Sequence, residues 1–167
     1  MKTILQIAGI IGLFTFLSFK VYEKPASKDI TKFLTEAADA RMMDAAEGRL
    51  AAERGTTGEI RKYGVLMMKD QAFLLIKIRE LAESKNIALP KEISKEKSDA
   101  LKDLEKKYDK DFDKKFLSMI KIDHKRDVDE FKEASQSEDP DLSKFAKKHL
   151  PLIESHLAGV EKIKDEQ

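Results

Sequence analysis

The chain has 167 residues, 41% of them apolar and 38% charged, which suits one domain of ordinary size with a well-solvated surface. The 32 basic and 31 acidic residues nearly cancel, so the sequence lacks the basic surplus of nucleic-acid-binding proteins and we expect no nucleic acid partner. The absence of cysteine excludes disulfides, thiol catalysis and a lipid anchor attached to cysteine.

Residues 1–20 form the most apolar part of the chain. Lys2 supplies a positive start, and residues 4–19 are almost uninterrupted apolar. A helix of that length reaches roughly 24 Å, short of the roughly 30 Å hydrocarbon core of a bilayer. The segment is therefore predicted to be a signal peptide, or a retained N-terminal membrane anchor because no clear cleavage motif follows it, with an ordinary buried helix as the remaining alternative. We expect an exported protein, periplasmic or tethered to the cell envelope, which touches the membrane only through residues 4–19 if they are retained.

The remainder of the chain has helical periodicity, with apolar residues recurring at intervals of three and four. Residues 21–28 are a polar linker. A first helix is expected from Asp29 to the break at residues 55–57, where a threonine can cap the second helix. The second helix is expected to end near Asn86, and residues 94–107 suggest a short helix in the long connection that follows.

Two more long helices complete the predicted domain, which spans residues 29–165. Asp139 and Pro140 are typical of a helix start, and Pro151 is expected to kink the last helix. The connections are short, long and short in order. This pattern predicts an all-α fold: a ferritin-like four-helix bundle with a crossover connection that contains a short extra helix.

A polar residue interrupts the apolar face of each long predicted helix. Counting 1.5 Å per residue from the short turns puts all of these residues near the middle of a bundle about 38 Å long. Helical bundles place metals and cofactors at this height, between facing helices. The residues are Asp44, Gln71, His124 and His156.

Three interpretations of this cluster stay open, one of which is that the side chains are partly exposed and have no role. The side chains can satisfy one another by hydrogen bonds, helped by a buried water. Alternatively, Asp44, His124 and His156 bind a divalent metal ion, with Gln71 as a weak or indirect ligand. No other cofactor is expected. His149 lies two turns before His156, roughly 10.5 Å away, so it is too distant to share an ion directly and is predicted to be structural or half-exposed.

The order and spacing of several landmarks resemble one bacterial family. They include Phe33, Asp44, residues 54–71, Asp123-His124 and His156-Leu157. The match is to the domain of unknown function 4142, often labelled "predicted outer membrane protein" and grouped with ferritin-like bundles. The resemblance implies a ferritin-like fold and an envelope location. It also implies Glu at position 44 and His at position 71, so this chain keeps two of three histidines, and glutamine is a poor ligand for soft or borderline metals.

Catalytic motifs are missing from the sequence. There is no Glu-x-x-His repeat of the di-iron proteins, no glycine-rich phosphate loop, no nucleophile elbow and no zinc-protease motif. Enzymatic activity is therefore not expected. The sequence favours a non-enzymatic binding or structural domain of the bacterial envelope, acting on an unknown envelope protein or small ligand. A metal- or cofactor-binding bundle is the alternative.

Overall fold

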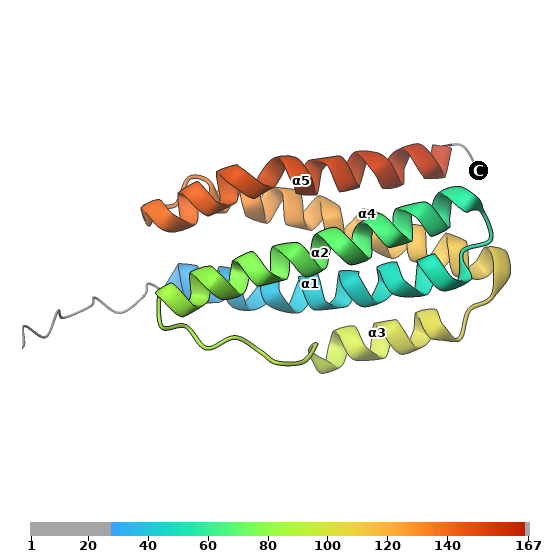
Figure 1. Cartoon of the computed structure of the whole chain (residues 1–167), viewed down its shortest axis with the longest axis horizontal. Coiled ribbons are helices and arrows are strands. Elements are labelled where there is room, and N and C mark those ends of the chain that lie inside the picture. Colours follow the sequence, from blue (N-terminus) through green and yellow to red (C-terminus); the bar gives the residue numbers. More distant parts are fainter. Residues whose placement is uncertain (1–27, 166–167) are drawn as a thin grey trace, which may run out of the picture.

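The computed structural model of the chain describes residues 28–165, and all regular secondary structure within that range is α-helical. The prediction of an all-α fold is confirmed, whereas the predicted signal or anchor in residues 1–20 lies outside the described residues. No helix within the described range is long and apolar enough to cross a bilayer. The helices are α1 (Lys28–Arg54), α2 (Gly58–Ser84), α3 (Lys95–Glu105), α4 (Asp109–Ala134) and α5 (Pro140–Asp165) (Figure 1).

Four long helices lie side by side along the length of the molecule, as two antiparallel pairs. Helix α1 packs mainly on α2, and α4 packs mainly on α5. The connection between the pairs includes the short helix α3, which lies against α1 and α4 and runs back along the bundle (Figure 1). As a result α2 and α4 run in the same direction. The predicted short helix in this connection is confirmed.

Helix starts follow the capping signals of the sequence. The Thr57 side chain accepts a hydrogen bond of 3.2 Å from the backbone N–H of Ile60, as expected for the start of α2. At the start of α5, the carboxylate of Asp139 accepts a bond of 3.1 Å from the N–H of Leu142, and Pro140 is the first helical residue. Helix α5 continues without interruption through Pro151, which is exposed to solvent.

The buried core is divided along the bundle axis into two apolar parts and a polar layer between them. In α1 the buried side chains are apolar up to Ala40, then include the charged Arg41, Asp44 and Glu47 beside Met43, and are apolar again from Leu50. The other three long helices show the same order, with polar residues between the two apolar clusters. Apart from Asp113 and His149, the buried charged and polar groups therefore share one level, which the apolar ends shield from solvent.

Two glycines allow the backbones of α1 and α2 to approach closely beside this layer. A Cβ atom added at Gly64 would lie 2.5 Å from the backbone nitrogen of Ala52, and one added at Gly48 would lie 2.7 Å from that of Met68. Real Cβ atoms do not come so near to backbone atoms, so any larger residue would push the helices apart. The close contact fixes α1 against α2 at the height where α1 carries Glu47.

Candidate functional site

The polar layer brings together residues from all four long helices, including the four that the sequence singles out. Asp44 on α1, Gln71 on α2, His124 on α4 and His156 on α5 all have at most 1% of their surface exposed. The predicted convergence in mid-bundle is therefore observed. The layer also holds Arg41, Glu47 and Asp127, all buried, and is bordered by the partly exposed Asp70 and Asp123.

On the side of the layer that faces α5, Gln71 joins the two histidines. The Nδ1 atom of His124 lies 3.1 Å from the carbonyl oxygen of Ile120, and Nε2 of His156 lies 2.9 Å from a carboxylate oxygen of Asp70. Carbonyl and carboxylate oxygens accept hydrogen bonds, so these two ring nitrogens carry the protons. The other two ring nitrogens are then acceptors, and both face Nε2 of Gln71, at 3.1 and 3.2 Å. One amide group thus donates its two hydrogens to two imidazoles.

The electrostatic environment keeps both rings neutral. Burial, helped by the positive charge of Arg41, lowers the pKa of His124 to about 3. Burial also lowers the pKa of His156, although its hydrogen bond to Asp70 opposes the shift. The ring centroids are 5.5 Å apart in an edge-on arrangement. With neutral rings, the hydrogen-bonding pattern through Gln71 is complete for all four imidazole nitrogens.

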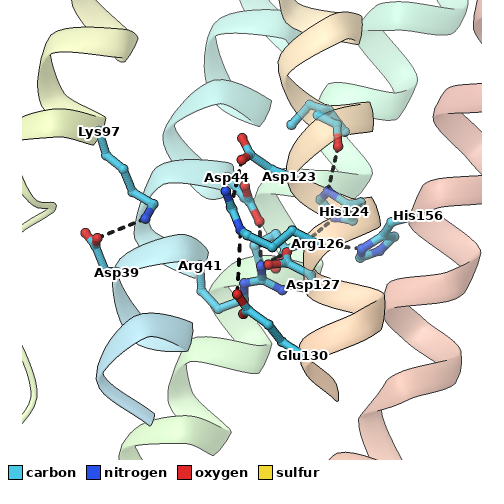
Figure 2. A network of polar contacts seen from close by, with 12 residues as sticks. Asp39, Arg41, Asp44, Lys97, Asp123, His124, Arg126, Asp127, Glu130 and His156 are labelled. Atoms are coloured by element: carbon cyan, nitrogen blue, oxygen red, sulfur yellow. Dashed lines mark hydrogen bonds and ion pairs between the residues drawn. The ribbon is translucent and has the colours of Figure 1, made fainter. Parts of the chain in front are cut away.

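On the side of the layer that faces α3, Arg41 forms ion pairs with two buried aspartates. Its Nη2 atom bonds to the carboxylate of Asp127 on α4 and lies 3.0 Å from Oδ2 of Asp44 (Figure 2). Burial opposes a charged guanidinium, but the carboxylates of Asp127 and Asp44 outweigh it and raise the pKa of Arg41. The Nε and Nη1 atoms of Arg41 donate no hydrogen bond to any described residue. Arg41 is thus held by charge rather than by a full set of hydrogen bonds.

The carboxylates on this side are less well satisfied than the imidazoles. Burial raises the pKa of Asp44 to about 7, with Arg41 opposing the shift and Asp127 adding to it. Burial and the neighbouring charge of Asp44 raise the pKa of Glu47 well above its usual range. Neither oxygen of Glu47, nor Oδ2 of Asp44, accepts a hydrogen bond from the described part of the chain. Buried acceptors without a donor are unusual in native proteins.

Among residues 28–165, two groups of three residues could each hold a metal ion. Each residue offers one ligand atom, and within a group these atoms all lie within 4.8 Å of one another. The first consists of Asp44, His124 and Asp127, and the second of Asp44, Glu47 and Asp123. Asp44 belongs to both groups. His156 belongs to neither, and both of its ring nitrogens are used in hydrogen bonds. The structure thus places Asp44 and His124 together and ties His156 to them through Gln71, while binding of a metal by these residues stays a prediction.

Three buried members of the layer and the two residues that border it, Asp70 and Asp123, were not among the predicted site residues. Arg41 and Glu47 lie three residues before and after Asp44, and Asp127 lies three residues after His124, so helical periodicity does put them on the same faces. A charged residue in a helix is ordinarily solvent-exposed, however, which hides the signal. Asp70 precedes Gln71 in the chain and sits at the edge of the layer.

The third histidine lies apart from the layer. His149 is 6% exposed and packs on Phe145, with ring centroids 4.6 Å apart. Phe145 in turn packs against the apolar cluster that contains Ile153. Partial burial and the adjacent Lys148 lower its pKa. The structure thus gives His149 a packing role and no part in either ligand group.

The fold and the layer define a small all-α protein whose helical bundle encloses a buried polar centre. A family model described as "Domain of unknown function (DUF4142)" matches residues 20–163, and the chain belongs to that family. The fold is similar to the crystal structure of a DUF305 fragment from Deinococcus radiodurans, with a TM-score of 0.72 and 14% identity over 86% of this chain and 100% of that one. A comparison with curated proteins gives no match.

Proposed function

We propose that the protein is a non-enzymatic helical binding module of the bacterial cell envelope. The observation that supports this is that the polar side chains of the layer are buried inside the bundle. Arg41, Gln71 and His124 are fully buried and Asp44 is 1% exposed, so an organic substrate has no direct contact with them. Enzyme active sites usually lie in concave pockets that admit the substrate. An ion or a proton can reach such a buried centre, whereas larger partners would contact only the charged outer surface.

The arrangement of helices supports a ferritin-like class within the helical bundles. Two antiparallel pairs joined by one long crossover, with α2 and α4 running in the same direction, is the connectivity that distinguishes this class from simple up-and-down bundles (Figure 1). Functional groups of such bundles project inward from facing helices at mid-height. The polar layer of this chain has that position.

The envelope location rests on residues 4–19, and a fractionation experiment tests it. The full chain with a C-terminal tag is produced in a Gram-negative host beside a variant carrying Leu13→Arg, which interrupts the apolar segment. We expect the wild type in the periplasm or membrane fraction and the variant in the cytoplasm. Mass spectrometry of the recovered protein shows whether the segment is removed. Equal cytoplasmic retention of both proteins would contradict export.

A second candidate function, binding of a divalent metal ion, is favoured by the two ligand groups that share Asp44. Elemental analysis of the purified full chain, before and after incubation with a panel of divalent metals, tests it. We expect close to one ion per chain in the wild type and a clear loss with Asp44→Asn. The matched control is Asp39→Asn on the same helix, because Asp39 pairs with Lys97 of α3, outside the layer. A metal-free wild type under all conditions would contradict this function.

A further inference from the structure

The imidazoles do not offer a free ligand atom in this arrangement. Two of the four ring nitrogens of His124 and His156 carry protons that are donated to Ile120 and Asp70. The other two accept hydrogen bonds from the amide of Gln71. A metal ion can bind only an unprotonated nitrogen, so it would have to displace the Gln71 amide first. A metal ion that enters the layer therefore breaks fewer hydrogen bonds if it binds the carboxylates instead of the imidazoles.

Glu47 offers two free ligand atoms deep in the bundle. Its side chain is fully buried, and neither carboxylate oxygen accepts a hydrogen bond from the described residues. A buried carboxyl group that accepts no hydrogen bond destabilises the fold. Such a group in a native protein usually has a partner, such as a bound water or ion. Glu47 lies one helical turn after Asp44, and an oxygen of each comes within 4.8 Å of the other. The position is thus suited to a ligand that satisfies both groups.

Asp123 completes this group from the opposite helix and reaches toward solvent. Its ligand oxygen lies within 4.8 Å of those of Asp44 and Glu47, although it sits on α4 while they sit on α1. The Asp123 side chain is 24% exposed, and Arg126 bonds to its Oδ1 at 2.7 Å (Figure 2). Asp123 therefore lies between the buried carboxylates and the solvent. A small ion can reach the buried carboxylates past its side chain.

We propose that Asp44, Glu47 and Asp123 bind one hard divalent cation, which cross-links α1 to α4. This inference rests on the second candidate function and names the site and the class of ion. The three ligands are all carboxylates, which hard ions such as Ca²⁺ and Mn²⁺ prefer over softer metals that favour nitrogen and sulfur. Calcium takes oxygens at about 2.3–2.6 Å, so two ligands on opposite sides of the ion are up to about 5 Å apart. The observed spacing fits that range.

The charges of the site agree with this ligand. Burial raises the pKa of both Asp44 and Glu47, which favours their protonated forms, and a bound cation competes with those protons. Arg41 already pairs with Asp127, and Asp123 pairs with the partly exposed Arg126, whereas neither oxygen of Glu47 accepts a hydrogen bond from the described residues. A dication would supply a partner for Glu47. Binding is therefore expected to release protons and to tighten as the pH rises.

Isothermal titration of the full chain, stripped with a chelator, tests the site with Ca²⁺ and Mn²⁺ as probes. We expect one site per chain in the wild type, and at least a tenfold loss of affinity in Glu47→Gln and in Asp123→Asn. The matched control is Glu36→Gln, an exposed residue of α1 that should leave affinity within twofold. Circular dichroism melts without metal show that each variant is folded, and addition of the ion should raise the melting temperature of the wild type and the control only.

Two results would overturn the proposal, and they bear differently on the second candidate function. Metal binding that is unchanged in Glu47→Gln and Asp123→Asn but lost in His124→Ala would move the ion to the imidazole side and leave metal binding intact as a function. No binding of any divalent metal by the wild type would reject both the site and the function.

Discussion

The two sides of the polar layer differ in how fully their hydrogen-bonding groups are satisfied. On the imidazole side, one amide of Gln71 and two outer acceptors account for all four nitrogens of His124 and His156. On the carboxylate side, Glu47 and Asp44 retain oxygens that accept no hydrogen bond from the described residues. At the same height, α2, α4 and α5 thus build a network that leaves Oε1 of Gln71 without a donor among the described residues, whereas α1 and α4 build a more open cluster of carboxylates. A closed network specifies and stabilises a fold, whereas an open one is where a ligand gains the most.

Arg41 is the buried cation of the carboxylate side, and its removal should give the largest effect on stability. Arg41→Met keeps an unbranched apolar side chain but leaves Asp127 and Asp44 without their buried cation. We expect a loss of about 3–5 kcal/mol in the free energy of unfolding, measured by urea denaturation, because breaking one partner of a buried ion pair leaves an uncompensated charge. Arg49→Met on the exposed side of α1 is the control and should change stability by at most about 0.5 kcal/mol. Equal effects would mean that the buried pair adds nothing specific.

The pH dependence of stability separates the carboxylates from the imidazoles. The pKa of Asp44 is raised to about 7 in the folded state, so the folded protein holds a proton there that the unfolded chain releases above about pH 4. The stability contributed by Asp44 is fully present below about pH 4 and is lost as the pH rises to about 7. Its size is up to about 4 kcal/mol.

Measuring urea unfolding of the wild type and Asp44→Asn between pH 3 and 8 tests this. We expect the stability of the wild type relative to the variant to fall as the pH rises through that window. The pKa of His124 is lowered to about 3, so its own effect has the opposite sign: stability is lost as the pH falls below about 6.5. That effect is present in both proteins and cancels in the difference. A difference that does not change with pH would show that folding does not shift the pKa of Asp44.

The fold was largely accessible from the sequence because its signals are local and repeated. Helical periodicity, the Thr57 cap, the Asp139-Pro140 start and the length of the connection before Asp109 each constrain one element independently. Heights along the bundle follow from a fixed rise per residue, which is why the convergence of Asp44, Gln71, His124 and His156 could be predicted.

The content of the site was harder to predict because it depends on side-chain directions between helices. Arg41 and Glu47 are charged residues with helical spacing to Asp44, and sequence alone does not distinguish a buried charge from a solvated one. The sequence also grouped His156 with Asp44 by height, whereas the structure directs its ring toward Gln71 and Asp70. Height along an axis is encoded locally, but the direction in which a side chain points depends on all the neighbouring helices.

Replacement of Gln71 by glutamate tests whether the amide is what closes the imidazole side. Gln71→Glu has almost the same shape but cannot donate two hydrogens, so both imidazole acceptors lose their donor. We expect a loss of about 1–3 kcal/mol without metal, measured by urea unfolding in the presence of a chelator. We also expect gained binding of Zn²⁺, because two imidazole nitrogens and a carboxylate form a favourable zinc set. The exposed Gln136→Glu is the control, and zinc binding by the wild type with equal affinity would contradict the role of Gln71.

Substitution of Tyr63 should give the smallest of these effects on stability. Tyr63 links the imidazole side to one apolar end of the bundle. Its hydroxyl donates a 2.8 Å hydrogen bond to the carbonyl oxygen of His156, and its ring packs on Phe116 and against Gly159 of α5. Tyr63→Phe removes the bond and keeps the ring, so unfolding should become easier by about 1 kcal/mol. If the hydroxyl only fills space, stability will be unchanged. If it also fixes the height of His156, the Zn²⁺ affinity gained by Gln71→Glu will be lower in the Tyr63→Phe/Gln71→Glu double variant, because the position of the imidazole then depends on a contact outside the polar layer.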